Sequence, residues 1–137
     1  MGFYWKLRFR TWDLEIITMI KIKRLYKSFT YAFRGLGKTL KEEQNLQIQS
    51  IAGLVVIILG WYFRIEVEKW LILILVIGLV ILMELINSAV ERITDVLKPR
   101  LDSYVKEIKD IMAAAVMLAS VIAIIVGLII FLPYFIN

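Results

Sequence analysis

Four oxygen-bearing side chains recur at intervals of three and four residues within one apolar stretch, namely Glu84, Asn87, Glu91 and Asp95. On an α-helix, which turns by about 100° per residue, they fall within an arc of roughly 80°. Carboxylates are costly at hydrocarbon depth, so those found there are usually paired, bound to a metal or functional. The spacing therefore favours a catalytic or metal-binding face. The alternative is a structural polar contact between helices.

The composition limits the chemistry that this acidic face can perform. The 137 residues contain no cysteine and no histidine, which excludes disulfides, thiolate metal sites and histidine bases. A metal ion would therefore be a hard cation such as Mg²⁺, bound by carboxylate, carbonyl or phosphate oxygens. Two carboxylates suit a Mg²⁺ ion whose other ligands are water and nucleotide phosphate. Glu43 is expected at the same cytoplasmic level as Glu91 and can approach it.

The helices that position these groups are expected to cross a membrane. Hydrophobic residues make up 61% of the chain and the mean hydropathy is +0.78, far above the values of a soluble domain. Apolar stretches at about 46–63, 70–91 and 111–135 each supply the roughly 18 to 20 residues that a span needs. Small residues in the third stretch, from Ala113 to Ser120, allow helix backbones to approach closely in a bilayer.

The N-terminal part is expected to lie on the membrane surface. Residues 28–49 predict an amphipathic helix with a basic side, because Phe29, Phe33, Leu36 and Leu40 are three or four residues apart. Residues 1–27 are interpreted either as a basic segment on an anionic leaflet or as a poorly ordered leader, and 1–21 of them form a basic N-terminal extension. The run from Gly35 to Thr39 is not a phosphate loop, because the full glycine pattern and its preceding strand are absent.

Residues 92–110 are predicted to be a polar loop, with Pro99 ending the second helix. Lys109 and Asp110 are then expected to begin the third helix, where free backbone amides favour anions such as polyphosphate. The alternative for this pair is an ordinary interfacial arrangement. Ten lysines and arginines precede Ser50, two lie in 64–69 and five in 92–110. The N-terminus and the 92–110 loop are therefore predicted to be cytoplasmic, and the membrane surface explains the basic residues better than nucleic acid does.

Several motifs, in order along residues 22–135, are similar to those of a known family. They are Ser28-Phe29-x-Tyr31-Ala32-x-x-Gly35, Glu43-Gln44-Asn45, Glu84-x-x-Asn87-Ser88-Ala89-x-Glu91-x-x-x-Asp95 and Lys109-Asp110-x-x-Ala113-Ala114-Ala115-Val116. Together they resemble the prokaryotic diacylglycerol kinase and undecaprenol kinase family. The chain then divides into the extension 1–21 and a membrane lipid kinase domain at 22–137.

The resemblance implies a role for each matching residue. Glu84 matches the proposed catalytic base, and Asn87 matches a neighbour that supports it. Glu43 and Glu91 match the two carboxylates that hold the divalent ion. Residues that match contacts to the nucleotide or its phosphates are Arg24, Tyr31, Arg34, Asp95, Lys109 and Asp110, of which the first three are weaker matches. Gln49 stands where some diacylglycerol kinases carry a second glutamate, which implies fewer acidic contacts to the nucleotide.

The resemblance further implies a membrane lipid, MgATP and two further copies of the chain as partners. The fold expected is an all-α membrane protein, with three transmembrane helices and an N-terminal amphipathic surface helix in a homotrimeric bundle. The reaction expected is transfer of the γ-phosphate of ATP to a lipid alcohol at a bacterial cell membrane, with Mg²⁺ as cofactor. Undecaprenol is the favoured acceptor and diacylglycerol the alternative. Outside the family, the competing interpretation is a non-enzymatic helical subunit of a transporter or channel.

Overall fold

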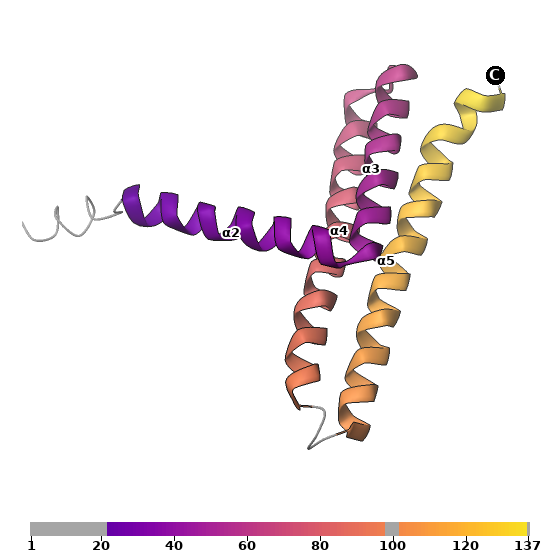
Figure 1. Cartoon of the computed structure of the whole chain (residues 1–137). Helices are drawn as coiled ribbons and strands as arrows, with labels where there is room; N and C mark the ends of the chain where they lie inside the picture. The colour runs from indigo at the N-terminus through magenta and orange to yellow at the C-terminus, as the bar shows by residue number, and fades with distance from the viewer. Residues whose placement is uncertain (1–21, 98–101, 137) are drawn as a thin grey trace, which may run out of the picture. The chain divides into compact units, whose positions relative to one another are not determined.

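A computed structural model describes residues 22–97 and 102–136, and within these ranges the chain is helical with no strand. The helices are α2 (Ile22–Glu42), α3 (Gln44–Tyr62), α4 (Val67–Leu97) and α5 (Asp102–Ile136) (Figure 1). Contacts divide the chain into two units, Met1–Lys38 and Thr39–Asn137, and each is described by itself. The predicted N-terminal extension 1–21 lies outside the described residues.

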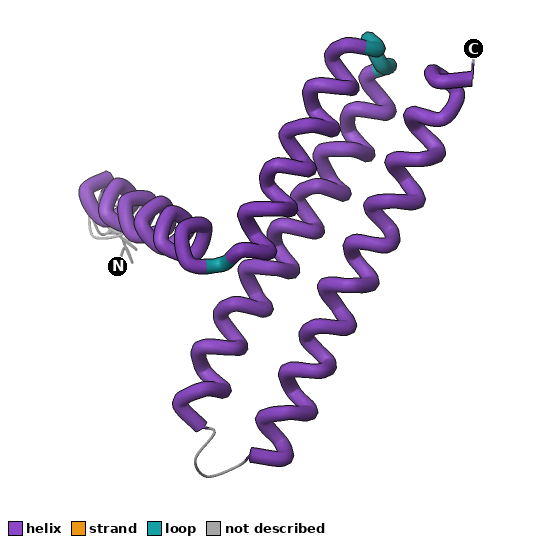
Figure 2. Tube along the Cα trace, turned by 45° about the vertical axis from the view of Figure 1, so that its right-hand side comes forward, coloured by secondary structure: helices purple, strands orange, loops and turns teal. Residues whose placement is uncertain are grey.

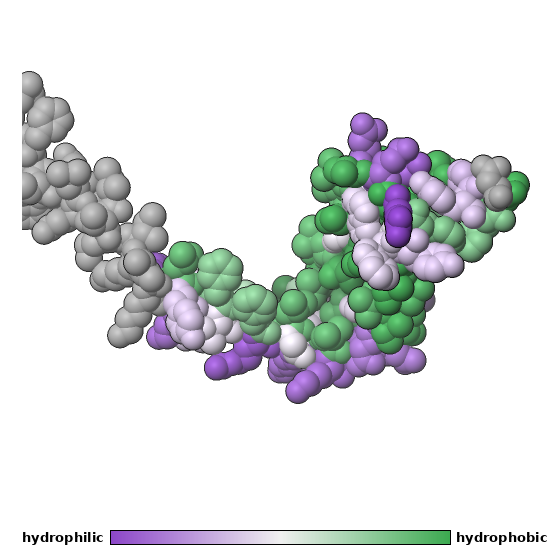
Figure 3. Space-filling model, turned by 90° about the horizontal axis from the view of Figure 1, so that it is seen from above, coloured by the Kyte–Doolittle hydropathy of each residue, from purple (hydrophilic) through white to green (hydrophobic). Residues whose placement is uncertain are grey.

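The first unit contains most of α2, which is strongly amphipathic. Large apolar side chains on this helix, including Leu25, Phe29 and Phe33, are exposed. Figure 3 shows apolar and polar side chains on opposite sides of α2. An exposed apolar face beside a polar one is typical of a helix that lies in a membrane interface, which agrees with the predicted surface helix.

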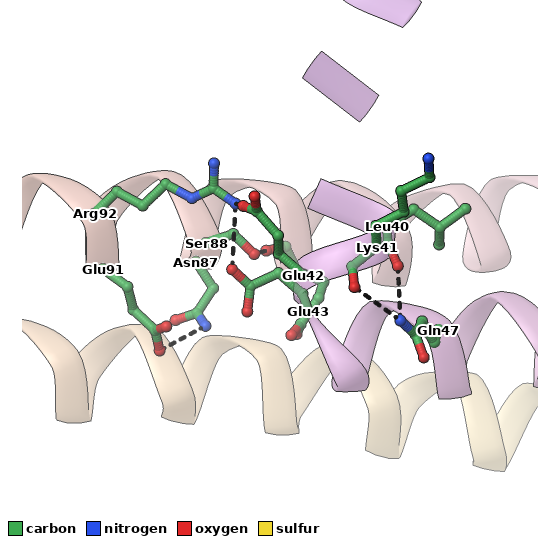
Figure 4. Close-up of polar contacts among 10 residues, drawn as sticks. Leu40, Lys41, Glu42, Glu43, Gln47, Asn87, Ser88, Glu91 and Arg92 are labelled. Carbon is green, nitrogen blue, oxygen red and sulfur yellow. Dashed lines mark hydrogen bonds and ion pairs between the residues drawn. The ribbon is translucent and has the colours of Figure 1, made fainter. Parts of the chain in front are cut away.

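The chain breaks its helix at Glu43, which has an extended backbone with φ −104° and ψ 108°. The prediction of one amphipathic helix through residue 49, with Glu43 on it, is therefore wrong. Gln47 secures the junction, because its Nε2 donates to the carbonyl oxygens of Leu40 at 2.9 Å and Lys41 at 3.3 Å (Figure 4). These carbonyls belong to the last turn of α2, where no intrahelical donor remains. The Glu43 side chain does not cap α3 and is left to contact other groups.

The second unit contains three long apolar helices, α3, α4 and α5, which run side by side (Figures 1 and 2). Each is long and apolar enough to cross a membrane, over Gln44–Tyr62, Val67–Val96 and Ser103–Ile136. The all-α fold with three long apolar helices is thus confirmed. At 1.5 Å per residue, the 31 residues of α4 extend for about 46 Å, well beyond a hydrocarbon core of about 30 Å.

The extra length of α4 and α5 corrects the predicted polar loop at 92–110. Residues 92–97 continue α4 and residues 102–110 begin α5, so only 98–101 lie outside the described residues, together with the predicted helix end at Pro99. Lys109 and Asp110 consequently lie two turns inside α5 and not at its N-terminus. The helix-dipole argument for anion binding by this pair is therefore wrong.

A compact apolar cluster packs the three helices together at the end away from Glu43, where the α3–α4 turn lies near the end of α5 (Figure 2). Its buried members are Ile65, Leu73, Ile130 and Phe131. Phe63 adds ring contacts to Phe131, Tyr134 and Phe135 at centroid distances of 6.2, 5.4 and 5.1 Å. Lys69 Nζ donates to the Tyr134 hydroxyl at 3.2 Å and so joins α4 to α5. Because these contacts hold the three helices together at this end, they limit how far the helices can slide past one another at the end that carries Glu84.

Glycines allow α3 to approach α4 closely. A Cβ added at Gly60 would meet the Trp70 ring at 3.0 Å, and one added at Gly53 would meet Ile77 Cγ2 at 3.1 Å. Both distances are shorter than ordinary van der Waals contact. Small residues at such points bring two helices together without displacing the side chains opposite.

Candidate active site

Glu84 is the most deeply buried charged residue among those described, with 2% of its surface exposed. It lies on α4 and faces the beginning of α3, where Gln49 Nε2 donates to Glu84 Oε2 at 3.3 Å. The carboxylate therefore meets an amide donor from the neighbouring helix, which compensates in part for its removal from water.

Asn87 and Glu91 form a second polar contact, one turn further along α4. Asn87 Nδ2 donates to Glu91 Oε1 at 3.1 Å (Figure 4). Asn87 is 9% exposed and Glu91 is half-buried. The amide expected to support Glu84 thus holds Glu91 in this structure, and its catalytic role remains a prediction.

Arg92 joins α4 to the junction between α2 and α3. One of its guanidinium nitrogens lies 3.0 Å from Glu42 Oε2 and 3.3 Å from Glu43 Oε1 (Figure 4). Sequence reasoning missed Arg92 and Glu42. The available signal was a basic residue directly after Glu91 and an acidic pair at 42–43, but nothing in the sequence places these segments side by side.

Lys109 brings α5 into the same region. Its ammonium group pairs with Asp95 Oδ1 on α4 and lies near enough to Glu91 for their charges to interact. Asp110 follows Lys109 on α5 and is exposed. The Lys109–Asp95 pair lies toward the polar ends of both helices, where α4 and α5 extend past the length that a membrane core requires.

The structure therefore brings together most of the predicted site residues. The charges of Glu43 and Glu91 both act on Glu84, so the three carboxylates belong to one cluster. Asn87 hydrogen-bonds Glu91 of this cluster, and Lys109, which pairs with Asp95, lies near enough to Glu91 for their charges to interact. Arg24, Tyr31 and Arg34 are exposed on α2 and belong to the other unit, so their place in the site stays a prediction.

An apolar groove leads away from the cluster along the helices. It has a volume of about 590 Å³ and is lined by side chains of α3, α4 and α5. Gln49 lies at the end nearest Glu84, and Phe135 lies at the other. Apart from Gln49 and Ser120, the lining consists of apolar residues and glycine. A buried carboxylate thus stands between an apolar groove and a charged surface.

The sequence matches a family model described as prokaryotic diacylglycerol kinase over residues 30–131. The chain belongs to the prokaryotic diacylglycerol kinase family. Undecaprenol kinase of Bacillus subtilis strain 168 is 36% identical over 113 residues, covering 82% of this chain and 92% of that protein. Diacylglycerol kinase of Synechocystis is 33% identical over 110 residues, covering 80% of this chain and 63% of that protein. That of Escherichia coli K12 is 25% identical over 112 residues, covering 82% and 92%.

Membership in this kinase family gives the site its general chemistry. The protein is a membrane lipid kinase, and a kinase of this kind uses a nucleoside triphosphate as its phosphate donor. The non-enzymatic alternative of a transporter or channel subunit is thereby set aside.

The donor atoms of the site can be compared with the needs of a divalent cation. In the described part of the chain, no group of three or more Asp, Glu, His or Cys side chains is arranged to hold a metal ion. Glu43 and Glu91 offer carboxylate oxygens alone, which fit Mg²⁺ when water and triphosphate complete its octahedral shell. Glu43 now contacts Arg92, so cation binding there would replace one positive charge with another.

Proposed function

We propose that this protein transfers the γ-phosphate of MgATP to the hydroxyl group of undecaprenol. The observation that carries the proposal is the position of Glu84, a buried carboxylate between an apolar groove and a cluster of charged groups. A lipid alcohol needs an apolar path for its chain, whereas a nucleotide needs a polar surface for its phosphates. The two requirements meet at this residue.

Glu84 acts as the general base in this proposal. It takes the proton from the lipid hydroxyl while the hydroxyl oxygen attacks the γ-phosphorus, and the bond to the β-phosphate oxygen breaks to release ADP. The transfer is direct and in line, with no covalent enzyme intermediate. The burial of Glu84 keeps bulk water from competing with the lipid as acceptor.

The remaining site residues bind the donor. Glu43 and Glu91 would hold Mg²⁺, which neutralises charge on the phosphates when bound. Asn87 fixes one oxygen of Glu91. Asp95, Lys109 and Asp110 contact the nucleotide or its phosphates from α4 and α5, and Arg24, Tyr31 and Arg34 contact it from α2, by their match to the family's motifs.

The choice of undecaprenol rests on similarity. Undecaprenol kinase of Bacillus subtilis is 36% identical to this chain, while diacylglycerol kinases of Synechocystis and Escherichia coli are 33% and 25% identical. Diacylglycerol remains the second candidate, because both acceptors are lipids that end in a primary alcohol. Either hydrocarbon chain would lie in the groove that leads away from Glu84.

The proposal includes a setting for the enzyme. It is a multi-pass protein of the bacterial cell membrane, with the N-terminus and residues 92–110 in the cytoplasm, where ATP is available. It assembles as a homotrimer. The exposed small residues Ala113 and Ala114 on α5 would favour close packing of helices from different copies.

One experiment tests the reaction and the acceptor together. Purified protein in mixed micelles receives labelled ATP and Mg²⁺, with undecaprenol and diacylglycerol in parallel. Preferential labelling of undecaprenol is expected, and the absence of labelled lipid from both would refute the proposal. Glu84→Gln should lower turnover by about 10²- to 10⁴-fold with the oligomer intact. Glu66→Gln, in the α3–α4 turn, is the matched control and should retain full activity.

A further inference from the structure

The side-chain amide of Gln49 is only half satisfied. Its Nε2 donates to Glu84 Oε2 at 3.3 Å. Its Oε1 is buried, and among the described residues it is the one buried side-chain oxygen or nitrogen with no hydrogen-bond partner. A buried polar atom without a partner is unfavourable and is rare in folded proteins. Such an atom beside a reacting group indicates a donor that arrives with the substrate.

The orientation of this amide follows from its neighbour. If the amide were reversed, its oxygen would face a carboxylate oxygen, and two acceptors cannot hydrogen-bond to each other. The nitrogen must therefore face Glu84, which leaves the oxygen for a different partner. Gln49 also lines the apolar groove at the end nearest Glu84, and the Ser120 hydroxyl, the other hydrogen-bonding side-chain group of the lining, does not bond to Gln49 Oε1.

We propose that Gln49 is a positioning residue for the lipid hydroxyl, an inference that rests on the proposed function. Its Nε2 holds Oε2 of Glu84 in place, and the Glu84 carboxylate takes the proton that is removed. Its own Oε1 accepts a hydrogen bond from the hydroxyl when the lipid enters the groove. The hydroxyl then turns from Gln49 to Glu84 as it approaches the phosphate. Gln49 is thus a contact to the acceptor and not to the nucleotide.

Gln49→Met tests this role because methionine has nearly the same length and volume but neither an amide donor nor an amide acceptor. Loss of both hydrogen bonds should lower kcat/KM for the lipid by roughly 10- to 100-fold, with KM for ATP unchanged. Gln44→Met, on the exposed first turn of α3, is the control and should match the wild type. Gln49→Glu, which keeps the acceptor but loses the donor, should lower kcat more than it raises KM for the lipid.

A binding measurement separates this inference from the reaction itself. A short-chain polyprenol and its O-methyl ether, which lacks the hydroxyl proton, compete with a fluorescent lipid for the protein in micelles. The same pair is prepared for a diacylglycerol. Wild-type protein should bind each alcohol about tenfold more tightly than its ether, and Gln49→Met should bind the two alike.

The outcomes are distinct. If wild-type protein phosphorylates lipid but Gln49→Met keeps both the wild-type kcat/KM and the preference for alcohol over ether, the role of Gln49 is refuted while the proposed function stands. If no lipid is phosphorylated but the preference depends on Gln49, the reaction is refuted and the hydroxyl contact stands. If Gln49→Met does not fold, Gln49→Asn replaces it: its shorter amide should weaken the preference, and a full preference would overturn the inference.

Discussion

Asn87 Nδ2 donates to Glu91 Oε1 at 3.1 Å, one helical turn further along α4. Glu84, on the same face, takes its amide donor from Gln49 on α3 instead. Glu84 and Glu91 are therefore oriented by different amides from different directions. Each amide can therefore be replaced without removing the hydrogen bond that the other amide makes.

Replacing Asn87 tests the metal end of this face. Asn87→Ala removes the amide that fixes one Glu91 oxygen, so the Mg²⁺ concentration for half-maximal activity should rise several-fold, while KM for the lipid stays the same. A residue that hydrogen-bonds to a metal ligand typically changes the affinity for the metal by about 10-fold or more. A Mg²⁺ titration of initial rates measures the change.

Ser88→Ala is the control for that titration. Ser88 is also buried, but its hydroxyl donates to the backbone oxygen of Glu84 at 3.0 Å and does not touch Glu91. An equal shift in both variants would mean that Asn87 acts only through the packing of α4. A rise in lipid KM in place of the Mg²⁺ effect would place Asn87 at the acceptor end.

Arg92 should oppose binding of the divalent cation. Arg92→Gln removes the positive charge that lies 3.3 Å from Glu43 Oε1, so that a cation no longer has to displace it. The ion pair is partly exposed and is worth at most about 1 kcal/mol, so the Kd for Mn²⁺ should fall up to roughly fivefold. Electron paramagnetic resonance of Mn²⁺ measures this affinity without turnover. Arg92→Lys keeps the charge and should stay close to the wild type; weaker binding in Arg92→Gln would contradict the prediction.

Gly60 should not tolerate a side chain, although alanine normally stabilises a helix. Gly60→Ala places its Cβ 3.0 Å from the Trp70 ring, so Trp70 or α3 must shift, at a cost of about 1–3 kcal/mol. The melting temperature in detergent should therefore fall. In Gly78→Ala on α4, the added Cβ meets no atom within 4 Å, so the melting temperature should stay equal or rise. A higher melting temperature for Gly60→Ala would mean that the contact with Trp70 is loose.

The proposed orientation can be tested because the natural sequence has no cysteine. Arg64→Cys lies in the turn between α3 and α4, and Lys106→Cys lies near the start of α5. A membrane-impermeant maleimide applied to intact cells should label only the first, whereas both should react after lysis. Labelling of Lys106→Cys alone in intact cells would reverse the topology.

Much of the fold follows from the sequence because its main signal is strong. Long apolar runs leave a helix as the only simple way to satisfy the backbone in lipid, so three spans could be predicted. Hydropathy detects only the part inside the membrane, however. It placed the second span at about 70–91 and the third at about 111–135, whereas α4 continues past Arg92 and α5 begins before Lys109. Thr94 and Val105, which are buried, mark packing on these extensions that charge counts do not reveal.

The site could be predicted only where its residues share one helix or match a family motif. The face from Glu84 to Asp95 follows from a spacing of three and four along α4. Gln49 carries no charge and is 35 residues from Glu84, so nothing in the sequence pairs them. The contact of Arg92 with Glu42 and Glu43 likewise depends on the helix break at Glu43, which lies within a pattern that would suit one continuous helix.

The unbroken course of α4 has a consequence for how such a chain can change during evolution. Glu84 and Glu91 are held apart by seven residues of continuous helix, a rise of about 10 Å. One residue inserted between them would rotate Glu91 by about 100° around the axis and away from Glu43. An insertion of four would return it near the original face, but about 6 Å further away. Under the proposed function, a substitution on this helix alters one side chain, whereas an insertion between these two carboxylates moves every residue beyond it relative to Glu84.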